Sequence, residues 1–267
     1  MAEVREIKPG IPIFSFLKPK KIVRTYETEV QCQRNFAHGK FKALIIVYDD
    51  GTKETENRCP ECEKEWERLE KEQQEKELIK HYESCNIEPE FYGKKLSDFK
   101  ANTPSQIETL NAVQELINGK INSLVLLGGY GTGKTMLGSI LADMFDGKIY
   151  TMYEISTMIR QSYTIKAEKS ELEIVKELAS VPLLVFDEVG RTNSSSFNMN
   201  WLSYVYDKRH TRKLKTVFLG NGHLRKNCPD GGCEKCFENY MDGDVISRLR
   251  QDSKVINIVA DDYRAGK

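Results

Sequence analysis

The feature that most constrains the fold is a glycine-rich segment that joins an apolar run to a helical pattern. The eight residues GGYGTGKT at 128–135 directly follow the run SLVLL and precede a helical pattern near 135–145. A loop of this kind points backbone N–H groups at phosphate oxygens, the helix N-terminus adds a positive dipole, and the lysine reaches the terminal phosphates. The sequence therefore predicts a nucleotide-binding loop formed by Gly128, Gly129, Tyr130, Gly131, Thr132, Gly133, Lys134, Thr135 and Met136.

Polar residues follow two further apolar runs. Asp187 and Glu188 come after LLVF at 183–186, and Asn221 comes after TVFLG at 216–220. We expect Asp187 and Thr135 to hold Mg²⁺, and Glu188 to polarise the attacking water. Asn221 is placed to orient that water. An acidic pair also caps helices and an asparagine between two glycines is ordinary in turns, so these alternatives stay open. Together with Lys134, the pattern predicts ATP hydrolysis.

Short apolar runs alternate with helical patterns through the last two thirds of the chain. Alternation of this kind predicts an α/β fold with a parallel sheet covered by helices on both faces. The expected strands are 123–127, 148–151, 183–186, 216–220 and 256–259. The expected helices are near 135–145, 154–163, 170–179 and 198–209.

Cysteine spacing near the N-terminus indicates a metal site. Strand-like stretches IVRTYETEV and FKALIIVY bracket Cys32 and His38, and Cys59 and Cys62 follow in the sequence CPEC. Four soft or borderline ligands suit tetrahedral zinc, and a small β-rich module buries too little core to fold well without one. Unmetallated thiols with a surface histidine are the alternative. Cys85 has no nearby partner and is expected to be a small buried residue.

A second cluster of possible zinc ligands lies after the Asn221 strand. Its members are His223, Cys228, Cys233 and Cys236, in a turn-rich stretch that includes NCPDGGCEKC. The histidine is the weakest member of this set, so a second zinc site is a hypothesis rather than a requirement of the spacing. If metal binds there, it would brace the loop that positions Arg248.

The sequence divides into three parts at changes of pattern. Residues 1–62 are expected to form the zinc-binding, partner-interaction module. Residues 63–100 begin with the charged helical run EKEWERLEKEQQEKELIKHYESC, expected to be a solvated helix, and continue as an irregular connector. Residues 101–267 are expected to form the ATPase domain, with the cysteine-rich insertion at 223–236.

Composition limits the classes of partner. Forty basic and forty acidic residues cancel, so any contact with nucleic acid must be local rather than driven by a general positive field. No apolar run approaches the roughly 20 residues that span a bilayer, so no membrane contact is expected. The N-terminus lacks the pattern of a signal peptide, and an odd number of cysteines, seven, placed in two clusters and one single residue, fits a reducing compartment, so we expect a cytoplasmic protein.

The order of these motifs resembles the DnaC/IstB-like AAA+ ATPase family, which includes bacterial and phage helicase loaders. The resemblance extends from NIEPEFYGKKLSDF to DDYR and includes GGYGTGKT, ISTMIRQSY, ELASVPLLVFDEVG, TVFLGN and GDVISRLRQ. It implies an AAA+ P-loop fold and places Lys134 and Thr135 in Walker A, and Asp187 and Glu188 in Walker B. It also implies that Asn221 is sensor 1, Arg248 the arginine finger for a neighbour's nucleotide, and Arg264 the sensor 2 arginine. Arg250 is an alternative finger.

The resemblance further implies a function in DNA replication. Such proteins assemble with ATP into a ring or spiral, bind single-stranded DNA and, through the N-terminal module, bind a replicative DNA helicase. An IstB-like helper of DNA transposition is the alternative, and a zinc-containing adaptor that does not hydrolyse ATP is a third possibility. Candidate DNA contacts are Arg160, Tyr163, Lys166 and Lys169, although such residues more often form a solvated face.

Overall fold

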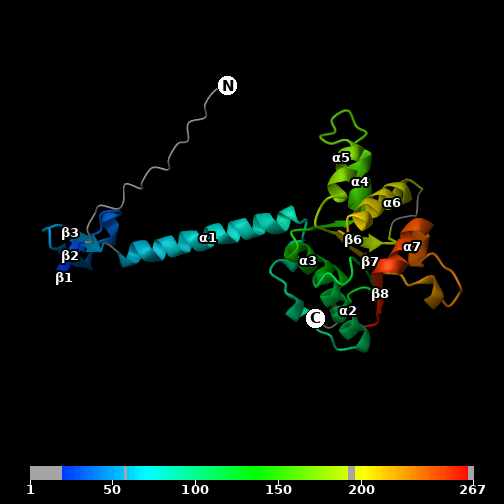
Figure 1. Ribbon diagram of the computed structural model, residues 1–267, viewed down its shortest axis with the longest axis horizontal. Helices are drawn as coiled ribbons and strands as arrows, with labels where there is room; N and C mark the ends of the chain where they lie inside the picture. Colours follow the sequence, from blue (N-terminus) through cyan, green and yellow to red (C-terminus); the bar gives the residue numbers. More distant parts are fainter. Residues whose placement is uncertain (1–19, 57–58, 192–195, 264–267) are drawn as a thin grey trace, which may run out of the picture. The chain divides into compact units, whose positions relative to one another are not determined.

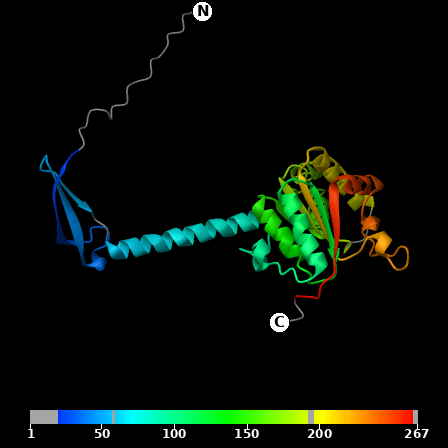
Figure 2. The same ribbon diagram turned by 60° about the horizontal axis from the view of Figure 1, so that its bottom comes forward.

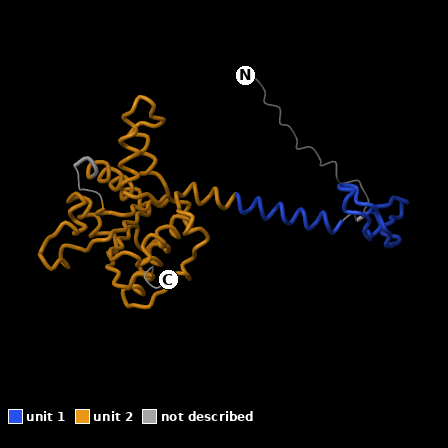
Figure 3. Tube along the Cα trace, turned by 180° about the vertical axis from the view of Figure 1, so that it is seen from behind, with its two compact units in different colours: residues 1–76 blue, residues 77–267 orange. Residues whose placement is uncertain are grey.

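The computed structural model describes residues 20–56, 59–191 and 196–263. The chain forms two compact units, Met1–Lys76 and Glu77–Lys267, which Figure 3 shows in separate colours. The division falls within a helix, so the second part of that helix belongs to the larger unit. The three-part division expected from the sequence stays a prediction.

The smaller unit contains a three-stranded antiparallel sheet in the order β1-β2-β3 (Figure 1). Its strands are β1 Ile22–Gln31, β2 Lys40–Tyr48 and β3 Lys53–Glu56. The expected β-rich module is confirmed, but the third strand was not expected, since KETE carries no apolar alternation. Most of β1 is exposed, and apart from the cysteines few side chains of this unit are buried.

Helix α1, Pro60–Ser84, follows the smaller sheet. Pro60 occupies the first helical position, where its missing N–H costs nothing, and two glutamates in the first turn favour the positive end of the helix dipole. Residues 63–80 are all exposed, as expected for a helix with charges all round. Beyond them, Tyr82, Cys85 and Ile87 are buried in the core of the larger unit, so the expectation for Cys85 is confirmed. No helix in the described parts of the chain is long and apolar enough to cross a membrane.

The larger unit is built on a five-stranded parallel sheet in the order β5-β6-β7-β4-β8. Each strand expected from the sequence is present, although the last begins three residues earlier than predicted. The strands are β4 Ser123–Gly128, β5 Lys148–Thr151, β6 Leu183–Val189, β7 Lys215–Gly220 and β8 Ser253–Ile258. β4 is buried along its whole length because helices cover both faces, which explains its uninterrupted apolar sequence.

Helices cover the two faces of this sheet (Figure 2). Alternate residues of β4 face opposite sides: Val125 and Leu127 belong to one core cluster, and Leu124 and Leu126 to the other. The first cluster is completed by α4 Met152–Gln161, α5 Glu171–Leu178, α6 Ser196–Thr211 and α7 Gly243–Asp252. The second is completed by α2 Pro104–Ile117, α3 Lys134–Met144 and the residues after α1. The predicted fold class is therefore confirmed.

Two helices were not expected from the sequence, α2 and α7. The signal for α2 was present, because Thr103 and Gln106 form a capping box with Pro104 at the first helical position. The Thr103 hydroxyl accepts a hydrogen bond from Gln106 N–H, and the Gln106 side chain accepts one from Thr103 N–H at 2.9 Å.

Candidate functional site

The carboxyl ends of three neighbouring strands meet at one edge of the large sheet. β7 lies between β4 and β6, and all three run in the same direction. The register pairs Leu127 of β4 with Gly220 of β7, and Gly220 with Val189 of β6. The glycine-rich loop, the acidic pair and the asparagine therefore share one edge, as the sequence predicted.

Two glycines of the loop occupy positions that other residues fit poorly. Gly128 has a φ of 147°, and a Cβ there would lie 2.4 Å from the carbonyl oxygen of Ile258 on neighbouring β8. Gly133 has a φ of 85°, caps α3, and a Cβ there would lie 2.8 Å from the Phe99 ring. Because both backbones are strained for other residues and both spaces are filled, glycine is required at each end of the loop.

The side chain of Lys134 lies inside the loop. It is only 6% exposed, and its Nζ donates to the carbonyl oxygens of Gly128 at 3.1 Å and Gly129 at 2.6 Å. A third bond, of 3.1 Å, goes to the Thr132 hydroxyl. The ammonium group is thus held by oxygen acceptors of the loop, and phosphate oxygens can replace these acceptors when a nucleotide binds.

Asp187 and Thr135 lie within hydrogen-bonding reach of each other. Burial raises the pKa of Asp187 above its usual value, opposed by hydrogen bonds from Glu188 N–H, at 2.6 Å, and from Thr135. The nearby charge of Lys134 also favours the ionised carboxylate. Oxygen ligands of this type suit Mg²⁺, and a bound cation favours the ionised form. The pair therefore fits the expected magnesium site.

Glu188 has an unusual backbone conformation. Its φ is 54°, and the pairing of β6 with β7 shifts between Phe186 and Val189. A left-handed non-glycine residue costs about 1–3 kcal/mol and is most often retained at functional sites. Its side chain forms an ion pair with Arg191, a residue that sequence reasoning did not select. The ion pair holds the carboxylate at the sheet edge beside Asp187.

Asn221 lies in the wall of a pocket next to the loop. The pocket brings together the ends of β4, β6 and β7 with part of the cysteine-rich insertion. It is lined by Leu127, Tyr130, Val189, Gly190, Arg191, Asn221, Gly222, Lys235, Phe237 and Tyr240. Sequence reasoning missed the contribution of Lys235, Phe237 and Tyr240, because nothing in the pattern indicated that the insertion folds back onto the loop.

The candidate arginines lie in different places. Arg248 of α7 pairs with Asp207 of α6 at 2.7 Å, and its side chain is one third exposed. Arg250 is exposed at the end of α7. Arg264 lies outside the described residues. Arg248 therefore pairs with an acidic residue of its own subunit. Lys134 and Asp187, by contrast, lie at the nucleotide-binding loop.

Two of the candidate DNA contacts pair with acidic side chains. Tyr163 donates a hydrogen bond to Glu171, and Lys169 forms a 2.5 Å ion pair with Glu177. Arg160 and Lys166 are exposed on the same segment. The segment is thus a mixed, solvated surface, and its positive charge is partly neutralised.

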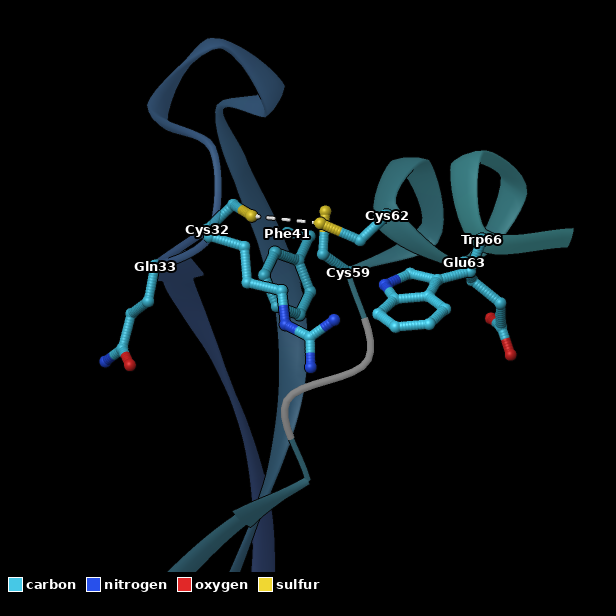
Figure 4. A pocket seen from close by; sticks show the side chains of 8 residues that line it. Cys32, Gln33, Phe41, Cys59, Cys62, Glu63 and Trp66 are labelled. Carbon is cyan, nitrogen blue, oxygen red and sulfur yellow. Dashed lines mark hydrogen bonds between the residues drawn. The ribbon is translucent and has the colours of Figure 1, made fainter. Parts of the chain in front are cut away.

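The first cysteine cluster comes together as the spacing predicted. Figure 4 shows Cys32, at the end of β1, pointing across to Cys59 and Cys62 at the start of α1. Cys32 Sγ lies 3.5 Å from Cys62 Sγ. His38 Nδ1 lies 3.3 Å from Cys62 Sγ, 3.8 Å from Cys59 Sγ and 3.9 Å from Cys32 Sγ. Zinc bonds of about 2.3 Å to sulfur and about 2.0 Å to nitrogen place tetrahedral donors roughly 3.5–3.8 Å apart. The four residues therefore fit zinc.

Backbone contacts around this cluster favour metal binding. Asn35 N–H lies 3.4 Å from Cys32 Sγ and, although burial opposes it, lowers the pKa of Cys32 to about 6. The thiolate is the form that binds metal. The other ring nitrogen of His38 lies 3.1 Å from the Asn35 side chain, a contact that orients the imidazole.

The second cluster also assembles. The ligand atoms of His223, Cys228, Cys233 and Cys236 lie within 4.8 Å of one another. None of the seven cysteines, all of which lie in the described ranges, forms a disulfide.

Comparison with known proteins agrees with this architecture. A family model described as IstB-like ATP binding protein matches residues 78–267. The replicative helicase loader DnaC of Escherichia coli strain K12 is 23% identical over 166 residues, which cover 59% of this chain and 67% of that protein. The chain therefore spans about two thirds of this relative's length.

Solved structures share the fold of the larger unit. The crystal structure of DnaI covers 65% of this chain and 95% of its own, with a TM-score of 0.51 at 20% identity. That of the DnaC helicase loader covers 64% of this chain and 100% of its own, with a TM-score of 0.50 at 18% identity. At these identities the likeness establishes the fold alone. The family match, together with the loop and acidic pair described above, confirms the predicted ATPase: this chain belongs to the family of IstB-like ATP-binding proteins.

Proposed function

We propose that this chain is an ATP-dependent loader that binds a replicative DNA helicase and deposits it on single-stranded DNA in the cytoplasm. The observation that carries the proposal is the similarity to the E. coli helicase loader, which extends over 166 residues. The match of residues 78–267 to an ATP-binding family supports the use of ATP in this role. The smaller unit, outside that match, is the part available for a dedicated partner.

The nucleotide site supports a division of roles among its residues. Lys134 binds the terminal phosphates, and Thr135 and Asp187 hold Mg²⁺, which neutralises charge on the phosphates when bound. Glu188 orients and polarises the attacking water, and Asn221 positions that water against the γ-phosphate. We infer that Glu188 exchanges its ion pair with Arg191 for the attacking water when ATP binds.

The smaller unit is the proposed helicase-binding module. Its metal cluster lies beside exposed apolar and aromatic side chains: Phe36 is 79% exposed and Trp66 is 60% exposed. Arg34 stacks over the Trp66 ring with its guanidinium carbon 5.3 Å from the ring centre. Exposed aromatic residues and arginine are the residue types that most often anchor protein interfaces. Zinc bound by Cys32, His38, Cys59 and Cys62 fixes the strand end and the helix start that carry them.

Loss of zinc from the smaller unit is expected to separate helicase binding from ATP turnover. Cys62→Ser should remove one zinc per chain and abolish the complex with helicase, because this unit has little other core. ATP turnover should stay within about twofold of the wild-type rate, since the larger unit has its own core and site. Zinc is measured by mass spectrometry, and Cys85→Ala serves as a control that changes a cysteine outside both clusters. Unchanged helicase binding without this zinc would contradict the role of the module.

Arg248 is proposed to complete the ATP site of a neighbouring subunit in a ring or spiral. Arg248→Ala should lower ATP turnover about a thousandfold if it acts as an arginine finger. Mixing Arg248→Ala subunits with Lys134→Ala subunits should restore part of the activity, since one contributes the loop and the other the arginine. Asp207→Asn, which removes only the partner of Arg248, is the control and should retain turnover. Absence of recovery on mixing would exclude an action between subunits.

The loader proposal is tested with the replicative helicase of the same genome. The purified chain and helicase are mixed with and without ATP, complex mass is measured by light scattering, and helicase transfer to a primed single-stranded circle is followed. We expect a complex that loads the wild-type helicase and fails to load with Lys134→Ala. Formation of ATP-dependent filaments on duplex DNA, with no helicase complex, would instead favour the transposition helper.

A further inference from the structure

We propose that the insertion between β7 and α7 is a second zinc site, and that this metal holds the wall, carrying Asn221, of the pocket next to the glycine-rich loop. The ligands are His223, Cys228, Cys233 and Cys236. The inference requires only the ATPase and not the helicase, so it stands or falls separately from the loader proposal.

The four donor atoms lie within 4.8 Å of one another, close enough for one metal ion to bind them all. His223 Nε2 lies 3.4 Å from Cys233 Sγ and 3.7 Å from Cys236 Sγ. Tetrahedral zinc with one nitrogen ligand places nitrogen and sulfur roughly 3.5 Å apart. Three sulfurs and one imidazole are ligands that select zinc over magnesium or calcium. The geometry thus supports the weakest member of the set, His223, as the fourth ligand.

The backbone around the last two cysteines is arranged as a metal-binding knuckle. Cys233 N–H donates to Cys236 Sγ at 3.3 Å, and Cys236 N–H donates to the carbonyl oxygen of Cys233 at 3.1 Å. The Asn239 side chain donates to the same carbonyl at 2.8 Å. Cys236 is completely buried. The turn thus directs a backbone N–H at the Cys236 sulfur, a contact that orients the sulfur for a metal ion.

The insertion has almost no core of its own. Between Arg225 and Cys236 the sequence RKNCPDGGCEKC contains no large apolar side chain. Its regular structure consists of short 3₁₀ turns at Arg225–Asn227 and Phe237–Tyr240 and an isolated β-bridge between His223 and Cys236. A segment of this composition cannot order itself by hydrophobic burial, whereas one metal ion fixes three separated points of its chain. Zinc therefore adds order to residues 225–236, while Leu224 and Phe237 on either side of them pack against the core of the larger unit.

The knuckle is attached directly to the turn that carries Asn221. His223 N–H donates to the carbonyl oxygen of Lys235 at 3.2 Å, and Phe237 N–H donates to the carbonyl oxygen of His223 at 2.9 Å. Between them, a Cβ added at Gly222 would lie 2.1 Å from the Lys235 carbonyl oxygen. Gly222 is therefore glycine because the knuckle backbone packs against it. The Cys233–Cys236 turn is thus joined by backbone contacts to the residues that follow β7.

The same insertion forms a wall of the pocket beside the glycine-rich loop. Lys235 and Tyr240 line that pocket together with Tyr130, Gly190 and Asn221. The Tyr240 ring lies against Gly190, which follows the acidic pair, and its hydroxyl donates to the carbonyl oxygen of Glu234 at 2.8 Å. Zinc bound here would fix the position of Asn221, which follows β7, relative to β6, which bears Glu188. The ion itself would not contact the nucleotide.

The metal is tested first, by zinc content and by a spectroscopic probe. Wild-type chain should contain two zinc ions, Cys233→Ser and Cys228→Ser one each, and Cys62→Ser combined with Cys233→Ser none. Cobalt substituted into the Cys62→Ser chain should show the intense visible bands of a tetrahedral thiolate site. Cys85→Ala should retain both ions. If Cys228→Ser and Cys233→Ser hold as much zinc as the wild type, the second site is overturned.

The coupling to the ATP pocket is tested with a glycine that is not a ligand. Gly222→Ala should push the knuckle away from the Asn221 turn and lower kcat by about tenfold to a hundredfold, with ATP affinity within about threefold, since small displacements of orienting groups act on the chemical step. Gly232→Ala, where an added Cβ meets nothing within 4 Å, is the matched control in the same insertion and should be neutral. Circular dichroism and zinc content confirm folding. Wild-type kcat in Gly222→Ala would overturn the coupling.

Discussion

Glu188→Gln is expected to lower the rate of ATP hydrolysis by about 10²–10³-fold while leaving ATP affinity within about threefold. The amide keeps the size and the backbone position of the glutamate but cannot accept a proton from water. Binding depends instead on the loop and on the Lys134 ammonium, which the substitution leaves intact. Single-turnover hydrolysis and fluorescent-nucleotide titration measure the two quantities separately.

Three further variants make this result specific. Lys134→Ala should lose ATP binding itself, because it removes the ammonium group that the loop residues 128–135 enclose. Glu168→Gln, an exposed carboxylate, should change neither quantity. Arg191→Ala should alter turnover by less than about fivefold, because an ion pair this exposed contributes at most about 1 kcal/mol. Full activity in Glu188→Gln would remove this residue from the mechanism.

The sequence identified Glu188 as a site residue but did not predict its backbone conformation or its partner. Asp187 and Glu188 follow a buried apolar run, and a position at a strand end is readable from the chain. The left-handed φ, the shifted pairing of β6 and the partner Arg191 depend on how β6 meets β7, which no local pattern encodes. The roles of the loop glycines were predictable from the sequence in the same way, because these glycines lie between an apolar strand and a helix.

The two cysteine clusters show the same limit. The spacing within CPEC and CEKC predicted one pair of ligands in each set, although in the first set Cys32 and His38 lie 27 and 21 residues before Cys59. The position of the second cluster beside the pocket next to the loop was not predictable. It depends on two contacts between segments that are separate in the chain, Gly222 with Lys235 and Gly190 with Tyr240. Helix α2 was predictable in principle from its capping box, whereas packing across the sheet edge was not.

Arg209 is a buried residue that the sequence does not predict to be buried. Arg209 in the last turns of α6 reads as an ordinary helix-surface cation in the run DKRHTRK, yet its exposure is 0%. Its Nη1 donates to the carbonyl oxygens of Leu178 at 2.9 Å and Val181 at 2.8 Å. Nη2 donates to that of Lys215 at 2.5 Å, and Nε to the Thr216 hydroxyl at 3.0 Å. One side chain therefore ties α6 to the end of α5, the start of β6 and the start of β7.

Arg209→Met is expected to destabilise the larger unit by about 3–5 kcal/mol, because it leaves several buried carbonyl oxygens without donors. Burial lowers the pKa of Arg209 to about 9, so the charge is retained at neutral pH and the loss should not vary between pH 6 and pH 8. Urea unfolding followed by Trp201, buried on the same helix, measures it in a Trp66→Phe background. Arg209→Lys keeps the charge but loses the planar fork, so its free energy of unfolding should lie between those of the wild type and Arg209→Met. Arg212→Met, exposed one turn later, should change stability by less than about 0.5 kcal/mol. An equally small effect at both positions would mean that water replaces the guanidinium, and that Arg209 does not hold these segments together.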